Sequence, residues 1–98
     1  MRFIVLLFFL HTIAFGQKAK TERIIELIEH SKSQKEVASL YYDLAGAYKN
    51  TEIDSAIYFA KKSYDIAKSS GNKKAYYESA AILGDYFIQK NQFNEAKF

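Results

Sequence analysis

The sequence predicts an all-α protein made of antiparallel helix hairpins. Proline does not occur among the 98 residues, and after Gly16 glycine occurs only at positions 46, 71 and 84. Because these helix breakers are rare, the stretches rich in alanine, leucine, lysine and glutamate favour helices. Apolar residues within these stretches recur at steps of three and four, which is the spacing of one helix face. Short polar segments separate the stretches, and short connections favour antiparallel packing of neighbouring helices.

Four helical stretches follow one another along the chain, the first over residues 20–30. Each carries an apolar stripe that we expect to pack against its neighbours. In chain order the stripes are Ile24, Ile25, Leu27 and Ile28; then Val37, Leu40, Tyr41, Leu44 and Tyr48; then Ile53, Ala56, Ile57, Ala60, Tyr64 and Ala67; and last Tyr76, Ala80, Leu83, Gly84 and Phe87.

The segments between the stripes carry signals for helix ends. Residues 31–34, with two serines, separate the first two helices. Thr51 followed by Asp54 predicts a capping box at the start of the third helix. Gly71 is suited to the left-handed position that closes it. Asn91 tolerates a left-handed conformation, so we expect the fourth helix to end near residues 90–92 and a fifth to begin after it.

Residues 1–16 have the pattern of a secretory signal peptide. Arg2 provides a positive start, an apolar run follows to about Phe15, and small residues stand at Ala14 and Gly16. Cleavage after Gly16 would leave Gln17 at the N-terminus. The alternative, a membrane-spanning helix, requires roughly 20 apolar residues, and the run is shorter. We therefore expect export, to the periplasm or another extracytoplasmic location.

Nothing in the sequence predicts a catalytic, cofactor or metal site, and we expect this part of a protein not to be an enzyme. There is no cysteine, and His30 is the one histidine outside the predicted signal. His30 follows Glu26 and Glu29 near a helix end, where interaction with the helix dipole explains a histidine better than metal binding. The net charge of +3 is spread along interleaved lysines and acids, so nucleic-acid binding is not expected either.

Two segments of the chain align with each other and suggest a helix-pair repeat. Leu44, Tyr48 and Ala56 in the first correspond to Leu83, Phe87 and Ala96 in the second, at a separation of about 40 residues, which is within the range of two-helix solenoid repeats. Ala45 and Gly84 are small, and small residues allow helix backbones to approach.

These residues resemble the tetratricopeptide-repeat (TPR) family, whose signature is Leu-Gly-x-x-Tyr in helix A and Ala-x-x-x-Phe in helix B. The sequence departs from this signature at Ala45, where glycine is usual, and at Ala60, where an aromatic residue is usual. The packing signature comprises Leu44, Ala45, Tyr48, Ala56, Leu83, Gly84, Phe87 and Ala96.

The resemblance implies a TPR-type α-solenoid and divides the chain into four parts. Residues 1–16 are the signal peptide, 17–34 a leading helix that could be a half-repeat, 35–72 a first repeat and 73–98 an incomplete second repeat. Solenoids usually need about three repeats, so we interpret the chain as a fragment of a longer protein. The face that a further helix would cover is expected to expose Leu83, Phe87, Phe93 and Phe98.

The resemblance also implies a function in protein–protein contact. Helix A of TPR proteins lines a concave groove, so Tyr42, Asp43, Tyr77 and Tyr86 are candidates for binding a protein or peptide; packing against adjacent repeats is the alternative. The chain resembles the exported sensory or scaffolding region of Bacteroidetes-type signalling proteins, in which a histidine kinase or transcription regulator follows. A free-standing secreted adaptor and a helical extension of an exported hydrolase are the alternatives.

Overall fold

The computed structural model describes residue 16 and residues 18–96, and almost all of them are helical. Residues 18–30 form a leading helix, followed by α2 (Gln34–Tyr48), α3 (Ile53–Ser70) and α4 (Lys73–Ala96). No strand occurs in this part of the chain, which confirms the predicted all-α arrangement of helix hairpins. Apart from Gly16, the predicted signal peptide lies outside the described residues. No helix within them combines the length and the apolar character needed to cross a membrane.

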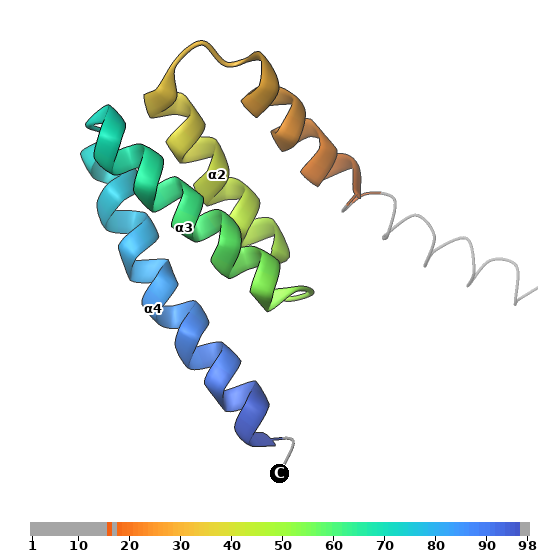
Figure 1. Ribbon diagram of the computed structural model, residues 1–98. Coiled ribbons are helices and arrows are strands. Elements are labelled where there is room, and N and C mark those ends of the chain that lie inside the picture. Colours follow the sequence, from red (N-terminus) through yellow and green to blue (C-terminus); the bar gives the residue numbers. More distant parts are fainter. Residues whose placement is uncertain (1–15, 17, 97–98) are drawn as a thin grey trace, which may run out of the picture.

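Helix α3 is the centre of the arrangement, because it packs along both α2 and α4 (Figure 1). Helices α2 and α3 form one antiparallel hairpin, and α3 and α4 form the next. The leading helix lies beside α2, on the side away from α4 (Figure 1). Helices α2 and α4 also touch each other over a short stretch. On the side turned away from α3, they form a common face, and the leading helix lies along the α2 edge of this face (Figure 1).

The helices meet mainly through small side chains. Alanine and serine residues with at most 2% of their surface exposed line the contacts, and they are Ala38, Ala45, Ala56, Ala60, Ser63, Ala67, Ala75 and Ser79. Small residues let the backbones of crossing helices approach closely and fill the space between them without voids. The buried hydroxyl of Ser63 is satisfied, since it donates a hydrogen bond of 2.7 Å to the Ala38 carbonyl oxygen.

Aromatic rings cover the edges of these small-residue contacts. Tyr41 and Tyr48 of α2 both stack on Phe59 of α3, with centroid distances of 6.0 and 5.6 Å. Tyr64 of α3 stacks on Tyr76 of α4 at 4.8 Å. Such ring pairs contribute about 1 kcal/mol beyond the area they bury, so they strengthen contacts in which each alanine buries little surface.

The buried face of α4 differs from the predicted stripe. Ala75, Ser79 and Tyr86 are buried, whereas Ala80 and Gly84 are exposed. The prediction followed apolar spacing alone and missed the small side chains of Ala75 and Ser79, which are buried. Tyr76 of the predicted stripe does pack against the core. Of the face that was expected to be exposed, Phe87 and Leu83 behave differently. Phe87 is 43% exposed, as expected, but Leu83 packs against the core.

The predicted helix ends are confirmed at Gly71 and wrong at two other places. Gly71 has a positive φ of 79° and its amide donates to the Ala67 carbonyl. The Thr51 capping box does not form. Residue Glu52 is the N-cap of α3, without a side-chain hydrogen bond, and the Thr51 hydroxyl donates back to Tyr48.

The break predicted at Asn91 is also absent, since α4 continues to Ala96. Every non-glycine residue of the described chain has a negative φ. An asparagine inside a helix costs less than about 1 kcal/mol, so without glycine or proline nearby the helix can continue through it. The expected beginning of a fifth helix therefore falls inside α4, and the side chains of Phe93, Ala96 and Phe98 lie outside the described residues.

Asn72 connects the start of α4 to the start of α2. Its side-chain oxygen accepts a hydrogen bond of 3.1 Å from the Ala75 amide and so caps α4. Its side-chain nitrogen donates to the Lys35 carbonyl at 2.7 Å and to the Ser39 hydroxyl at 3.1 Å. One amide group therefore caps a helix and joins segments that are 37 residues apart in sequence.

We predict that Asn72→Ala lowers the free energy of unfolding by about 2 kcal/mol, because it removes both a helix cap and the bonds to α2. Asn72→Ser is the matched variant: serine also caps helices well, but it lacks the amide that donates to α2. It should cost about half as much. Urea denaturation followed by circular dichroism measures both values, and equal losses would show that the bonds to α2 do not contribute.

Candidate functional site

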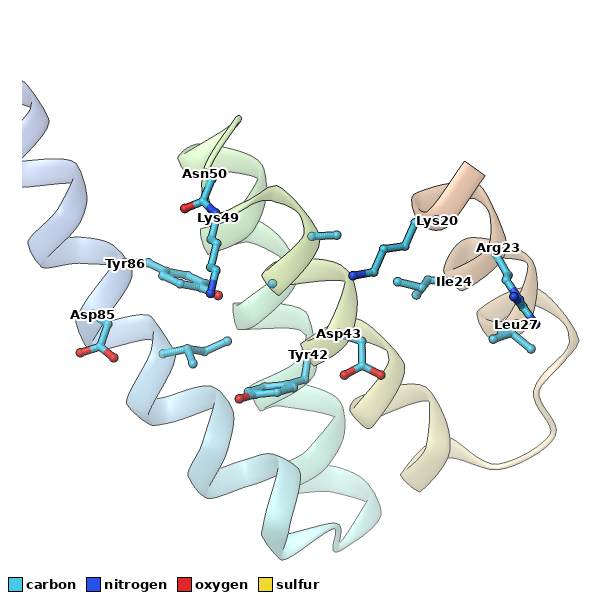
Figure 2. Close-up of a pocket in the computed structure, with 13 residues that line it drawn as sticks. Lys20, Arg23, Ile24, Leu27, Tyr42, Asp43, Lys49, Asn50, Asp85 and Tyr86 are labelled. Atoms are coloured by element: carbon cyan, nitrogen blue, oxygen red, sulfur yellow. The ribbon is translucent and has the colours of Figure 1, made fainter. Parts of the chain in front are cut away.

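A groove of about 860 Å³ runs between the leading helix, α2 and α4 (Figure 2). We call it the α2–α4 groove, after the helices that form its floor. It is lined by Lys20, Arg23, Ile24 and Leu27 of the leading helix; by Tyr42, Asp43, Gly46 and Ala47 of α2 with Lys49 and Asn50 after it; and by Ile82, Asp85 and Tyr86 of α4. Its volume is in the range of ligand sites in proteins.

Two tyrosines and two small residues shape the floor of the groove. Figure 2 shows Tyr42 pointing from α2 toward α4, and Tyr86 pointing from α4 toward α2. Gly46 and Ala47 follow on α2, and a Cβ atom added at Gly46 would meet no other atom within 4 Å. The hollow at this point therefore has room for a side chain of a bound molecule.

The leading helix provides an apolar wall that is incompletely buried. Leu27 is 49% exposed and Ile25 is 38% exposed, while Ile24 and Ile28 are partly buried. Figure 2 shows Ile24 and Lys20 pointing toward α2. Ile24 and Leu27 both line the groove, so apolar surface on this wall remains available for contact.

Charged groups of both signs surround the apolar part. Lys20, Arg23 and Lys49 provide three cations, and Asp43 and Asp85 provide two anions. Within the described residues the ion pairs lie elsewhere, between Lys74 and Glu78 and between Lys90 and Asp54. None of these five charges therefore forms an ion pair with another described residue, and they can interact with a bound molecule.

Tyr86 joins the groove to the protein core. Only 6% of its surface is exposed, and it belongs to the same buried cluster as Ala45, Ala56 and Ala60. Burial raises the pKa of the Tyr86 hydroxyl above the usual 10.0, with smaller contributions from Tyr42 and Asp85. Burial and both neighbours disfavour a negative charge on the Tyr86 oxygen, and Tyr86 is consequently a neutral hydrogen-bonding group at physiological pH.

Three of the four predicted binding residues come together here, and the fourth does not. Tyr42, Asp43 and Tyr86 line the groove, whereas Tyr77 is 69% exposed and is not part of the lining. Tyr77 and Tyr86 are separated by about two and a half helical turns, which places them on opposite faces of α4. The same helical arithmetic applied to the sequence would have separated them.

Residues of the leading helix were missed as part of the site. One wall is formed by Lys20, Arg23, Ile24 and Leu27, whereas the groove was predicted only from the helices that resemble helix A. The available signal was the apolar spacing of Ile24 and Leu27 in the first predicted stripe. The sequence did not predict on which side of α2 the leading helix lies.

The proposed packing signature is divided between buried and exposed positions. Leu44, Ala45 and Ala56 are at most 1% exposed, and Tyr48 packs against the core cluster. In the second segment Leu83 packs on that cluster while Gly84 and Phe87 are exposed. The first segment is therefore largely buried, and the second leaves part of its signature exposed.

No metal site was found in the part of the chain that the structure describes, where no three histidine, cysteine, aspartate or glutamate side chains gather. His30, Glu26 and Glu29 are all exposed on the leading helix. The groove itself contains hydroxyl, carboxylate, ammonium and guanidinium groups around an apolar centre. This arrangement is suited to contact with another molecule through both apolar and polar groups.

The raised pKa of Tyr86 predicts a loss of stability in alkaline solution. The folded chain holds this proton to a higher pH than the unfolded chain does. The contribution of the protonated Tyr86 hydroxyl to the free energy of unfolding is therefore complete below about pH 10, and it is lost as the pH rises through the raised pKa. Urea denaturation between pH 9 and 12 should show a steeper decline for the wild type than for Tyr86→Phe. Tyr58→Phe, at a 54% exposed ring, controls for removal of a hydroxyl; parallel curves for wild type and Tyr86→Phe would contradict the prediction.

Comparisons with protein-family models, curated proteins and solved structures find no match to this chain. The TPR resemblance therefore depends on the sequence motifs alone. The function has to be inferred from the groove and its chemistry.

Proposed function

We propose that this chain is a binding module that holds a short segment of another protein in the α2–α4 groove. The observation that carries this proposal is the combination of incompletely buried apolar residues, Ile24 and Leu27, with two tyrosines across one groove. Tyrosine is enriched at protein interfaces because it offers a large rigid ring and one polar atom. Leu27 gains burial when a partner covers it, which favours association.

The size of the groove fits a peptide segment. An α-helix has a diameter of about 10 Å and a pitch of 5.4 Å, so roughly two helical turns fill a volume of this order. Apolar side chains of such a segment would contact Ile24, Leu27 and Ile82, and one of them would enter the hollow at Gly46. The cations and anions at the rim would fix its orientation, since charge pairs contribute more to specificity than to affinity.

The wider setting of this module is proposed from the sequence motifs. The signal-like residues 1–16 support an exported protein, and the two aligned segments support a TPR-type scaffold. We propose that the chain is the extracytoplasmic sensory or scaffolding region of a bacterial signal-transduction protein. In that setting, occupation of the groove by a protein partner is the event to be sensed, and any catalysis belongs to another domain.

The groove can be tested with peptides selected on the wild-type protein from a random displayed library. We predict that Tyr42→Ala and Leu27→Ala each weaken binding of a selected peptide by about tenfold, because each removes a large contact from the centre of the site. Fluorescence anisotropy with the labelled peptide measures the dissociation constants. Tyr77→Ala is the matched control, since it removes an exposed tyrosine from the opposite face of α4.

The pattern across these three variants decides the proposal. Loss of binding in Tyr42→Ala and Leu27→Ala, with Tyr77→Ala like the wild type and helical content unchanged in all three, supports the groove. A peptide lost only in Tyr77→Ala would place binding on the outer face of α4. Failure to enrich any peptide on the wild type over a Leu27→Asp variant would contradict a peptide-binding groove.

Export has its own test. We predict that expression in a Gram-negative bacterium yields a periplasmic chain beginning at Gln17, identified by its intact mass. Gly16→Leu should retain the N-terminal segment, because signal peptidase requires a small residue before the cleaved bond. Phe15→Leu is the control at the neighbouring position, where no small residue is required, and it should be processed normally. Full-length wild-type protein in the cytoplasm would contradict export.

A further inference from the structure

Tyr64 and Tyr76 form a pair that differs from the other tyrosine contacts of the protein. Their rings stack with centroids 4.8 Å apart and an interplanar angle of 26°. Their hydroxyl oxygens are 3.1 Å apart and share a hydrogen bond. Because the oxygens are closer together than the ring centres, the two rings converge toward their hydroxyl ends. The carbons ortho to the hydroxyls are therefore among the ring atoms that lie nearest to each other.

We propose that Tyr64 and Tyr76 are a site of intramolecular dityrosine formation, which links α3 to α4 covalently when the protein meets a one-electron oxidant. The class of oxidant is a peroxidase that uses hydrogen peroxide. Each phenol loses one electron and one proton to give a phenoxyl radical. The two radicals couple through their ortho carbons, and both rings regain aromaticity by moving the ortho hydrogens to the phenolic oxygens. The product has lost two hydrogen atoms, and one hydrogen peroxide is reduced to two waters.

The surroundings of the pair favour this reaction over competing ones. Both rings are partly exposed, so an oxidant can reach them, yet each is already in contact with its partner. Of the eight tyrosines, Tyr58 and Tyr77 are the most exposed, at 54% and 69%. A radical on either of those is available for coupling between molecules, whereas a radical on Tyr64 or Tyr76 has a neighbouring phenol within hydrogen-bond distance.

A link at this position would act as a covalent staple in a chain that has no cysteine. The two residues are 12 positions apart and lie on either side of the turn at Gly71 and Asn72. Closing a loop restricts the unfolded chain and so stabilises the folded one, as a disulfide does. The link would keep α3 and α4 together as a hairpin and would thereby fix the position of α4 against the rest of the protein.

The experiment uses the full 98-residue chain at low concentration, treated with a peroxidase and hydrogen peroxide. We expect a monomer that is two hydrogen atoms lighter, dityrosine fluorescence, and a cross-linked peptide pair that contains residues 64 and 76. The thermal midpoint of the linked monomer should rise by about 5 °C or more. Tyr64→Phe and Tyr76→Phe keep the ring but lack the phenol, and each should abolish the lighter monomer.

The double variant Tyr58→Phe/Tyr77→Phe is the matched control. It removes the two most exposed phenols and should reduce cross-linked dimers while the intramolecular product remains. The proposal is overturned if the lighter monomer persists in Tyr64→Phe, if it disappears in the double variant, or if oxidation gives only dimers. Circular dichroism before oxidation establishes that each variant retains the helical fold, and this test is independent of whether the α2–α4 groove binds a peptide.

Discussion

Six of the ten buried hydrophobic residues in the described chain are alanines, so α2, α3 and α4 meet through side chains of a single methyl group. This close contact determines much of the remaining structure. Backbones that approach so closely leave little space between them, and large side chains must lie at the edges. The stacked rings around Phe59 and the Tyr64–Tyr76 pair occupy such edges. Replacement of a central alanine, such as Ala60, by a larger residue would force the helices apart.

The same constraint leaves room for the groove. With α3 packed on one side of both α2 and α4, no third helix of the described residues covers their opposite side. The leading helix borders that side without closing it, and Leu27 remains half exposed. Tyr86 takes part in both regions, since it belongs to the buried cluster and also lines the groove. Any molecule that touches Tyr86 in the groove therefore also touches a residue of the buried cluster that packs α4 against α2 and α3.

Side-chain hydrogen bonds between helices fix the register that the small residues leave undetermined. Alanine contacts are similar at many helix positions, so they specify the sliding of one helix on another only weakly. Ser63 bonds to the Ala38 carbonyl, and Asn72 bonds to Lys35 and Ser39 while it caps α4. Gln89 adds a bond to the Lys49 carbonyl at the other end of α4. These polar contacts join α2 to both later helices and determine which residues face the groove.

The sequence by itself determined the helical class, the approximate extent of the first three helices, the turn at Gly71 and the inward faces of α2 and α3, because spacing and a left-handed glycine are local properties. It grouped Tyr42, Asp43 and Tyr86, which the tertiary structure brings together in the lining of one groove. It did not determine the inward face of α4, the continuation of that helix through Asn91, or the contribution of the leading helix to the groove. Those features depend on which face of α4 meets α3 and on which side of α2 the leading helix lies. Contacts between residues far apart in sequence decide both, and only the tertiary structure contains them.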